Sequence, residues 1–337
     1  GFGLYTFVLS FSQYFLVITD YSFLLTATRD ISIARDDKKK ISDIYSAVMF
    51  VKLMLFILCI LIMAILILLF QKFRMEWTVY AVSLLGVLGN FLFPVWFYQG
   101  IEKTKYIAIY NGIARGAVTV CMFLFVKSEG DVLVAVFIQS MGVVLASIIS
   151  LVVMFKCWSV RIVMPSKKSI IFTIKSGWNI FITLLSATLV NNTNIFILGM
   201  LTNNQTVGYY AVADKIVRVF HSLVSPLSTA IYPRVSKLFK ESESTAVLFL
   251  RKILYYGGLG FMCCSIILLI FSGLFVRIFT GSYSWHIQKL VIILSILPLS
   301  IFIDNIYGQQ VLVNIGRTRE FMKGILFPGI GSLLLSF

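Results

Sequence analysis

Residues 53–70 read LMLFILCILIMAILILLF, so that 18 consecutive positions carry no charged or strongly polar side chain. An α-helix needs about 20 apolar residues to cross the hydrocarbon core of a bilayer. Nine other apolar segments accompany this one. The ten segments lie at about 4–28, 42–70, 78–100, 106–126, 131–155, 177–200, 207–233, 248–275, 289–313 and 321–337. The pattern predicts an all-α polytopic membrane protein.

The composition agrees with a bilayer environment. Of the 337 residues, 59% are hydrophobic and only 13% are charged, whereas a soluble domain has about 25% charged residues. The apolar runs are continuous, unlike the short alternating strands of a membrane β-barrel. With two histidines and no CxxC pair, the sequence predicts no metal site, and no motif in it indicates a cofactor.

The basic residues gather in alternate loops. One set of five loops holds 20 Lys and Arg residues and the other set holds 5, which by the positive-inside rule places the first set in the cytoplasm. These predicted cytoplasmic loops are 29–41, 101–105, 156–176, 234–252 and 316–323. The first segment then runs from outside to inside, so we expect one helix before Gly1. Because the charges are spread over separate loops, lipid headgroups rather than nucleic acid are the predicted contact.

An internal repeat becomes visible when the sequence is shifted against itself. A shift of 205 residues places 208–210 (GYY) on 3–5 (GLY), and a shift of 214 places 317–319 (RTR) on 103–105 (KTK). Both shifts pair a segment with the sixth one after it and preserve its orientation. Repeats of this kind are typical of secondary transporters with a site between the halves.

The repeat predicts two pseudo-symmetric six-helix lobes around a central cavity, with twelve helices in the complete protein. Residues 1–155 are predicted to form the N-terminal lobe, without its first helix. Residues 156–176 are predicted to be a basic cytoplasmic loop that joins the lobes. Residues 177–337 are predicted to form the C-terminal lobe, without its last helices.

The segment 207–233 carries a polar face. Asp214, Arg218, His221 and Ser225 follow one another at intervals of four, three and four residues, which places them on one side of a helix, with Lys215 beside them. A charge near the bilayer centre costs about 2.5–3.5 kcal/mol on insertion scales, so it marks a wet cavity or an internal pair. We predict that this face, Arg218 included, lines a wet cavity, because Lys215 leaves a surplus of positive charge beside Asp214. The alternative is an ion pair between Asp214 and Arg218 that only tethers the helix.

The first lobe has a matching polar face. Ser10, Gln13 and Asp20 share one side of segment 4–28, and under the 205-residue shift Gln13 falls on Arg218. Further candidates for the cavity are Arg115, Asn179, Asn194 and Asp304. Arg115 would lie about 15 Å from the nearest loop, too deep for easy snorkelling. For the asparagines, hydrogen bonding between helices is the alternative.

Three stretches resemble a known family. They are YSF at 21–23 with ATRD at 27–30, FPVWFYQGIEK at 93–103, and ADKIVR at 213–218 with SPL at 225–227 and YPRVS at 232–236. They are similar to the Wzx-type O-antigen flippases, the polysaccharide transporter branch of the multidrug/oligosaccharidyl-lipid/polysaccharide exporter superfamily. The resemblance implies twelve helices in the bacterial inner membrane. It also implies transfer of an undecaprenyl-diphosphate-linked repeat unit from the cytoplasmic to the periplasmic leaflet, without enzymatic chemistry.

The resemblance assigns roles to the polar candidates. Arg218, Lys215 and Arg115 are expected to neutralise the diphosphate. The side chains expected to face the glycan are His221, Gln13, Asn179 and Asn194. Asp20, Asp214 and Asp304 are expected to bind a coupling ion, a proton or sodium, or to serve as charge partners. Rocking of the lobes would alternate access, and other O-antigen assembly proteins are possible partners.

Two other functions compete with this one. A membrane-embedded polysaccharide polymerase or glycosyltransferase would need a long periplasmic loop or clustered catalytic carboxylates. A related exporter of small cationic drugs would need a cavity rich in acidic side chains, rather than the basic face around Arg218.

Overall fold

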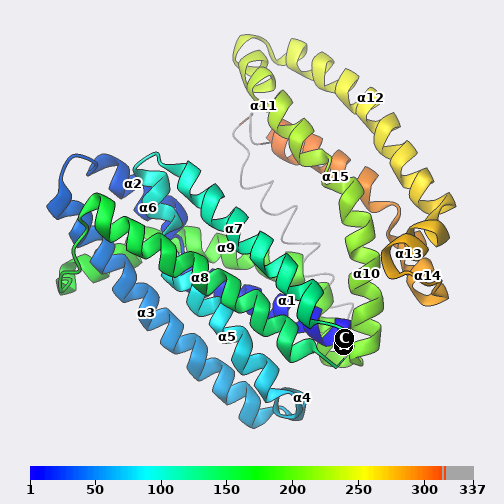
Figure 1. Ribbon diagram of the computed structural model, residues 1–337. Coiled ribbons are helices and arrows are strands. Elements are labelled where there is room, and N and C mark those ends of the chain that lie inside the picture. The colour runs from blue at the N-terminus through cyan, green and yellow to red at the C-terminus, as the bar shows by residue number, and fades with distance from the viewer. Residues whose placement is uncertain (129, 313–314, 316–337) are drawn as a thin grey trace. The chain divides into compact units, whose positions relative to one another are not determined.

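The computed structural model describes residues 1–128, 130–312 and 315, and helices joined by short turns make up most of this part (Figure 1). Within it, eight helices are long and apolar enough to cross a membrane. They are Phe2–Ile33, Lys38–Leu69, Trp77–Gly100, Thr104–Phe125, Val132–Trp158, Lys167–Ser186, Glu243–Ile270 and Trp285–Leu312. The prediction of an all-α polytopic membrane protein is therefore confirmed. The predicted segment 321–337 lies outside the described residues.

The chain divides into two compact units, Gly1–Asn192 and Thr193–Phe337. The helices of the first unit are α1 (Phe2–Asp20), α2 (Phe23–Ile33), α3 (Lys38–Leu69), α4 (Gln71–Met75), α5 (Trp77–Leu92), α6 (Val95–Gly100), α7 (Thr104–Phe125), α8 (Val132–Trp158) and most of α9 (Lys167–Leu201). The predicted loop 156–176 is shorter than expected, because α8 continues to Trp158 and α9 begins at Lys167. The assignment of 1–155 and 177–337 to separate lobes stays a prediction.

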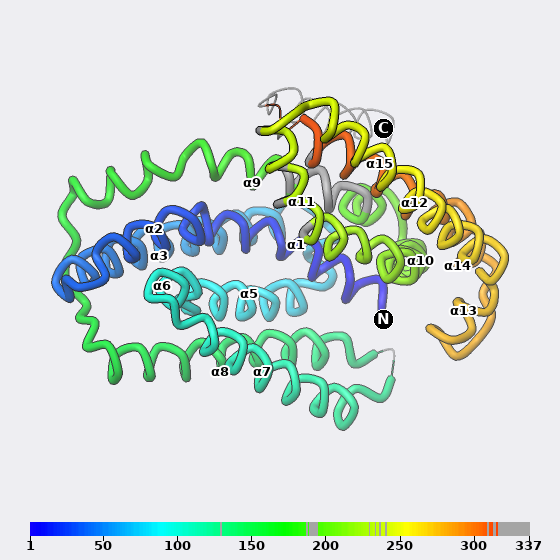
Figure 2. Tube along the Cα trace, turned by 90° about the horizontal axis from the view of Figure 1, so that it is seen from above, coloured from blue at the N-terminus to red at the C-terminus, as the bar shows by residue number. Residues whose placement is uncertain are grey.

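The first spanning segment is interrupted between α1 and α2. Tyr21 has φ 53°, a left-handed backbone conformation that stops the helix, and α2 then continues in the same general direction (Figure 2). Helix α9 contacts this break at two points. The Tyr21 hydroxyl donates to the carbonyl of Ile174 at 2.9 Å. Gly177 packs so closely that a Cβ there would lie 1.9 Å from Ser22 Oγ.

A second interruption separates α5 from α6. Helix α5 ends at Leu92, two residues before Pro94, which restricts the residue before it and lacks the N–H that would continue the helix. Helix α6 then packs on α2. Gly100 permits this approach, since a Cβ there would lie 2.6 Å from Ile31 Cγ2. The two broken spans therefore meet along their second halves.

The second unit contains α10 (Asn204–His221), α11 (Val224–Glu241), α12 (Glu243–Ile270), α13 (Ser272–Thr280), α14 (Trp285–Leu294), α15 (Leu297–Asp304) and the π-helix η1 (Asn305–Leu312). Segment 207–233 has a bend between α10 and α11. It lies at Ser222–Leu223, so that Pro226 falls in the first turn of α11, where proline is tolerated. Neither half is among the eight spans, because polar residues lower its hydropathy.

The two units share a pattern of internal contacts. In the first unit α1, α3 and α5 contact one another, and in the second unit α10, α12 and α14 do so. Likewise α2 contacts α6 in the first unit, and α11 contacts η1 in the second. The helices that correspond are those that the repeat pairs, so these contacts support the predicted internal repeat.

Candidate functional site

Three helices of the first unit meet at a charged cluster, made of Asp20 in α1, Lys52 in α3 and Asn90 in α5. The ammonium of Lys52 lies 3.0 Å from Oδ1 of Asp20 and 3.4 Å from the main-chain carbonyl of Asn90. The side-chain amide of Asn90 donates to Oδ2 of Asp20 at 2.8 Å. Both carboxylate oxygens are therefore engaged, each by a different helix.

The cluster lies deep in the spanning helices. Asp20 precedes Ile33, the end of α2, by 13 residues, and Lys52 follows the start of α3 at Lys38 by 14 residues. At 1.5 Å per helical residue, both lie about 20 Å from the loop 34–37. Such a depth is close to the middle of a bilayer whose hydrocarbon core is about 30 Å thick.

The burial of the pair is unequal. The Lys52 side chain is 1% exposed, whereas the Asp20 side chain is 48% exposed. A half-open carboxylate at this depth is costly against hydrocarbon, so it is compatible with a membrane only where it faces water or a polar ligand. The open side of the Asp20 carboxylate therefore needs water, a polar ligand or another polar group beside it.

Sequence reasoning recognised Asp20 and missed its partners. The Lys52 ammonium turns inward to Asp20 and does not reach towards the cytoplasmic surface. A signal was available: residues 20, 52 and 90 are the polar members of their segments that fall at similar depths. Hydropathy alone does not reveal that the side chains of these three residues face one another.

The polar face of α10 contains an ion pair. Nε of Arg218 lies 2.6 Å from Oδ2 of Asp214, with the side chains 53% and 15% exposed respectively. The internal i,i+4 pair that the sequence left as an alternative is thus formed, and more than half of the Arg218 side chain stays open beside it. Lys215 is exposed and His221 is half-buried on the same helix.

The other predicted residues lie apart from these two clusters. Gln13 in α1, Arg115 in α7, Asn179 in α9 and Asp304 in α15 are exposed. The side chain of Asn194 lies outside the described residues. The structure thus brings together Asp20 with Lys52 and Asn90, and Asp214 with Arg218. Within the part of the chain that the structure describes, no group of three or more His, Cys, Asp or Glu side chains could hold a metal ion.

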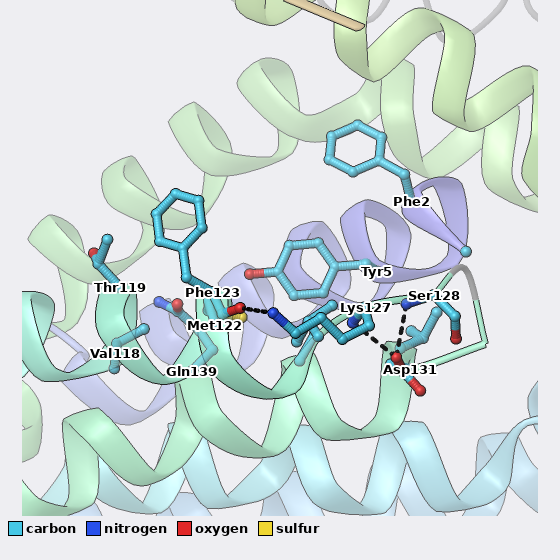
Figure 3. A pocket seen from close by; sticks show the side chains of 14 residues that line it. Phe2, Tyr5, Val118, Thr119, Met122, Phe123, Lys127, Ser128, Asp131 and Gln139 are labelled. Carbon is cyan, nitrogen blue, oxygen red and sulfur yellow. Dashed lines mark hydrogen bonds between the residues drawn. The ribbon is translucent and has the colours of Figure 1, made fainter. Parts of the chain in front are cut away.

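A separate cavity of about 720 Å³ lies between the start of α1 and the turn that joins α7 to α8. Tyr5, Thr119 and Gln139 line it together with apolar side chains, and Figure 3 shows the Tyr5 ring lying across it. Asp131 caps its edge by accepting from the backbone N–H groups of Lys127 and Ser128 at 2.9 and 2.8 Å. These bonds hold the pKa of the Asp131 carboxyl below its usual range. The predicted site residues are not among those that line this cavity.

Spanning helices interrupted beside a mid-depth charged cluster are typical of secondary transporters. Comparison with known sequences agrees with this class. The chain belongs to the family described as "Polysaccharide biosynthesis protein", which matches residues 1–239. It is 29% identical to the "Putative O-antigen transporter" of Escherichia coli (strain K12), covering 100% of this chain and 81% of that protein. It is 26% identical to the protein of the same description in Shigella dysenteriae, covering 95% and 80%. No solved structure matches it significantly.

Proposed function

We propose that this chain is a flippase for lipid-linked oligosaccharides in the bacterial inner membrane. Its substrate is an undecaprenyl-diphosphate-linked O-antigen repeat unit, which moves from the cytoplasmic to the periplasmic leaflet. The descriptions of the two relatives as O-antigen transporters support this class of substrate. The observation that carries the proposal is the half-open Asp20–Lys52 pair at mid-depth, beside the interruption between α1 and α2.

The chemistry of such a substrate explains what the protein has to supply. The long lipid tail can stay in the bilayer, so only the diphosphate and the sugars need shielding from hydrocarbon. Arg218, Lys215 and Arg115 supply positive charge to the diphosphate. Gln13, Asn179, Asn194 and His221 supply hydrogen bonds that replace water on the sugar hydroxyls. Alternating access requires the predicted lobes to rock around this polar surface.

The carboxylates divide into two groups under this proposal. Asp20 and Asp214 act as charge partners, because each has a basic side chain within 3.0 Å. Asp304 is the exposed carboxylate left to take a coupling proton or sodium ion. A polymerase or glycosyltransferase would instead use its carboxylates for bond chemistry, and the Asp20 and Asp214 carboxylates are already paired.

Complementation tests the proposal. The full-length gene is expressed in a strain that lacks its O-antigen flippase, and surface polysaccharide is measured together with the amount of protein in the membrane. We expect display to be restored by the natural protein and by Lys39→Met, a change at an exposed position. Asp20→Ala should reduce display at equal membrane abundance. Restoration of sugar polymerisation without restoration of flipping would contradict the proposal and favour the polymerase.

A further inference from the structure

The charged cluster of the first unit resembles a cation-binding site in which the ammonium of Lys52 takes the place of a bound ion. Asp20 offers a carboxylate, and Asn90 offers a main-chain carbonyl close to the end of α5. Carboxylates and carbonyls at interrupted helices are the groups that transporters use to bind sodium ions or protons. Here the position between the two oxygens is held by the ammonium of Lys52, at 3.0 and 3.4 Å.

We propose that Lys52 is the resident counter-cation of Asp20, so that the first unit binds no inorganic cation at this cluster. The ammonium reaches the cluster on an apolar stem that is itself buried, which fixes the charge in place without a requirement for external sodium. The inference rests on the proposed function and deepens it, because it adds to the role of Asp20 as a charge partner the consequence that Lys52 excludes sodium from this cluster. Its test does not depend on which substrate is moved.

The second unit supports this specific role for Lys52. Under the 205-residue shift, Lys52 falls on Gly257 in α12. The ring of Phe302 occupies the space that a side chain at Gly257 would need, since a Cβ there would lie 2.5 Å from Phe302 Cζ. Phe302 in turn stacks on Phe261, with ring centroids 4.7 Å apart. At the position in the second unit that corresponds to Lys52, aromatic packing therefore takes the place of the ammonium. Packing at this position thus does not by itself require a cation.

Removal of the ammonium should turn the cluster into an ordinary cation site. Lys52→Met keeps most of the apolar stem and deletes the charge. The Asp20 carboxylate and the Asn90 carbonyl then remain without their counter-charge. A sodium ion, or a proton on Asp20, becomes the simplest replacement. The double change Asp20→Asn with Lys52→Met removes both charges, so this variant should need neither sodium nor a proton at the cluster.

The experiment uses the full-length protein, purified and reconstituted in lipid nanodiscs. Thermal unfolding is followed in NaCl and in N-methylglucamine chloride at matched ionic strength, and binding of radioactive sodium is measured in parallel. In the natural protein and in the control Lys39→Met, we expect no saturable sodium binding that depends on Asp20. The added change Asp20→Asn should therefore leave their sodium binding unchanged. For Lys52→Met, we expect sodium or mild acid to raise the unfolding midpoint saturably. Saturable sodium binding should appear in Lys52→Met, and the added change Asp20→Asn should weaken that binding about 10- to 100-fold, the effect of one charge-assisted contact.

Three results would overturn the inference. The first is saturable sodium binding by the natural protein that Asp20→Asn abolishes, and this measurement decides even if Lys52→Met fails to fold. The second is a folded Lys52→Met protein that responds to neither sodium nor acid. The third is an equal sodium response in Lys52→Met and in the double variant. Because none of these readouts involves polysaccharide, a failure here is distinct from a failure of the proposed function.

Discussion

The side-chain amide of Asn90 donates to the carboxylate of Asp20 at 2.8 Å, across 70 residues of sequence. Each residue lies within three positions of the point where its spanning helix is interrupted, at Tyr21 for α1 and at Phe93 for α5. The contact therefore ties two helix breaks together. Lys52, on the uninterrupted helix α3, supplies the charge that makes this junction neutral.

Loss of Lys52 should destabilise the first unit. Removal of one partner from a fully buried ion pair costs about 3–5 kcal/mol. We expect about 1–3 kcal/mol for Lys52→Met in sodium-free buffer, because the Asp20 side chain is half open and partly screened by solvent. A double-mutant cycle with Asp20→Asn, read by thermal unfolding, checks this. Strictly additive effects of the two changes would show that the pair does not couple α1 to α3.

Arg218 should be the principal cation that faces the diphosphate. Its side chain is 53% exposed even though Asp214 pairs with its Nε, so its terminal nitrogens can still reach a ligand. Loss of one charge-assisted contact weakens binding about 10- to 100-fold. Arg218→Ala should therefore strongly reduce surface polysaccharide, and Arg218→Lys should restore part of it.

A tethering role for the Arg218–Asp214 pair predicts a different pattern. If the pair only holds α10, the double change Asp214→Ala with Arg218→Ala should be tolerated better than either single change. Recovery of polysaccharide display in that double variant, at equal membrane abundance, would reject the role in diphosphate binding.

The break between α1 and α2 should depend on the absence of a side chain at Gly177. A Cβ there would lie 1.9 Å from Ser22 Oγ and 2.9 Å from Tyr21 Cε1. We expect Gly177→Ala to cost about 1–3 kcal/mol, as over-packing typically does. Gly116→Ala in α7 is the matched control, since nothing lies within 4 Å of a Cβ at that position. Equal unfolding midpoints for the two variants would mean that α9 does not hold the break.

The N-terminus of α8 should loosen in acid. The folded-state pKa of Asp131 lies below its ordinary value, because backbone N–H groups donate to the carboxylate. The stabilisation is therefore fully present above the unfolded-state pKa of about 4 and is lost as the pH falls through the folded-state value. Amide hydrogen exchange at Lys127 and Ser128, corrected for intrinsic rates, should accelerate over this range. Asp131→Asn should show no such change, and constant protection in the natural protein would contradict the assignment.

The basic loops should lie in the cytoplasm. In a cysteine-free background, single cysteines placed in 29–41, 101–105, 156–176 and 234–252 should resist a membrane-impermeant thiol reagent in intact cells and react after permeabilisation. The reason is the 20-to-5 distribution of basic residues between the two sets of loops. A cysteine between α7 and α8 serves as the positive control. Labelling of two or more of the basic loops in intact cells would reverse the orientation.

Features that depend on residues close together in the chain could be predicted from the sequence. Runs such as 53–70 specify spanning helices, because the bilayer offers no partner for exposed backbone groups. The Asp214–Arg218 pair follows from the helical period, since residues four apart lie on one face. Pro94 indicates the end of α5, because proline lacks the N–H that would continue the helix.

Only the tertiary structure decided the charged cluster and one of the helix breaks. Lys52 lies 32 residues from Asp20 and 38 from Asn90, so no local period relates them. Which face of α3 turns towards α1 depends on the packing of all three helices. The break at Tyr21 contains no proline or glycine, and the Tyr21 hydroxyl bonds to a carbonyl of α9 more than 150 residues away. Hydropathy therefore determined which segments enter the membrane, whereas close packing between distant helices determined which of their polar groups meet.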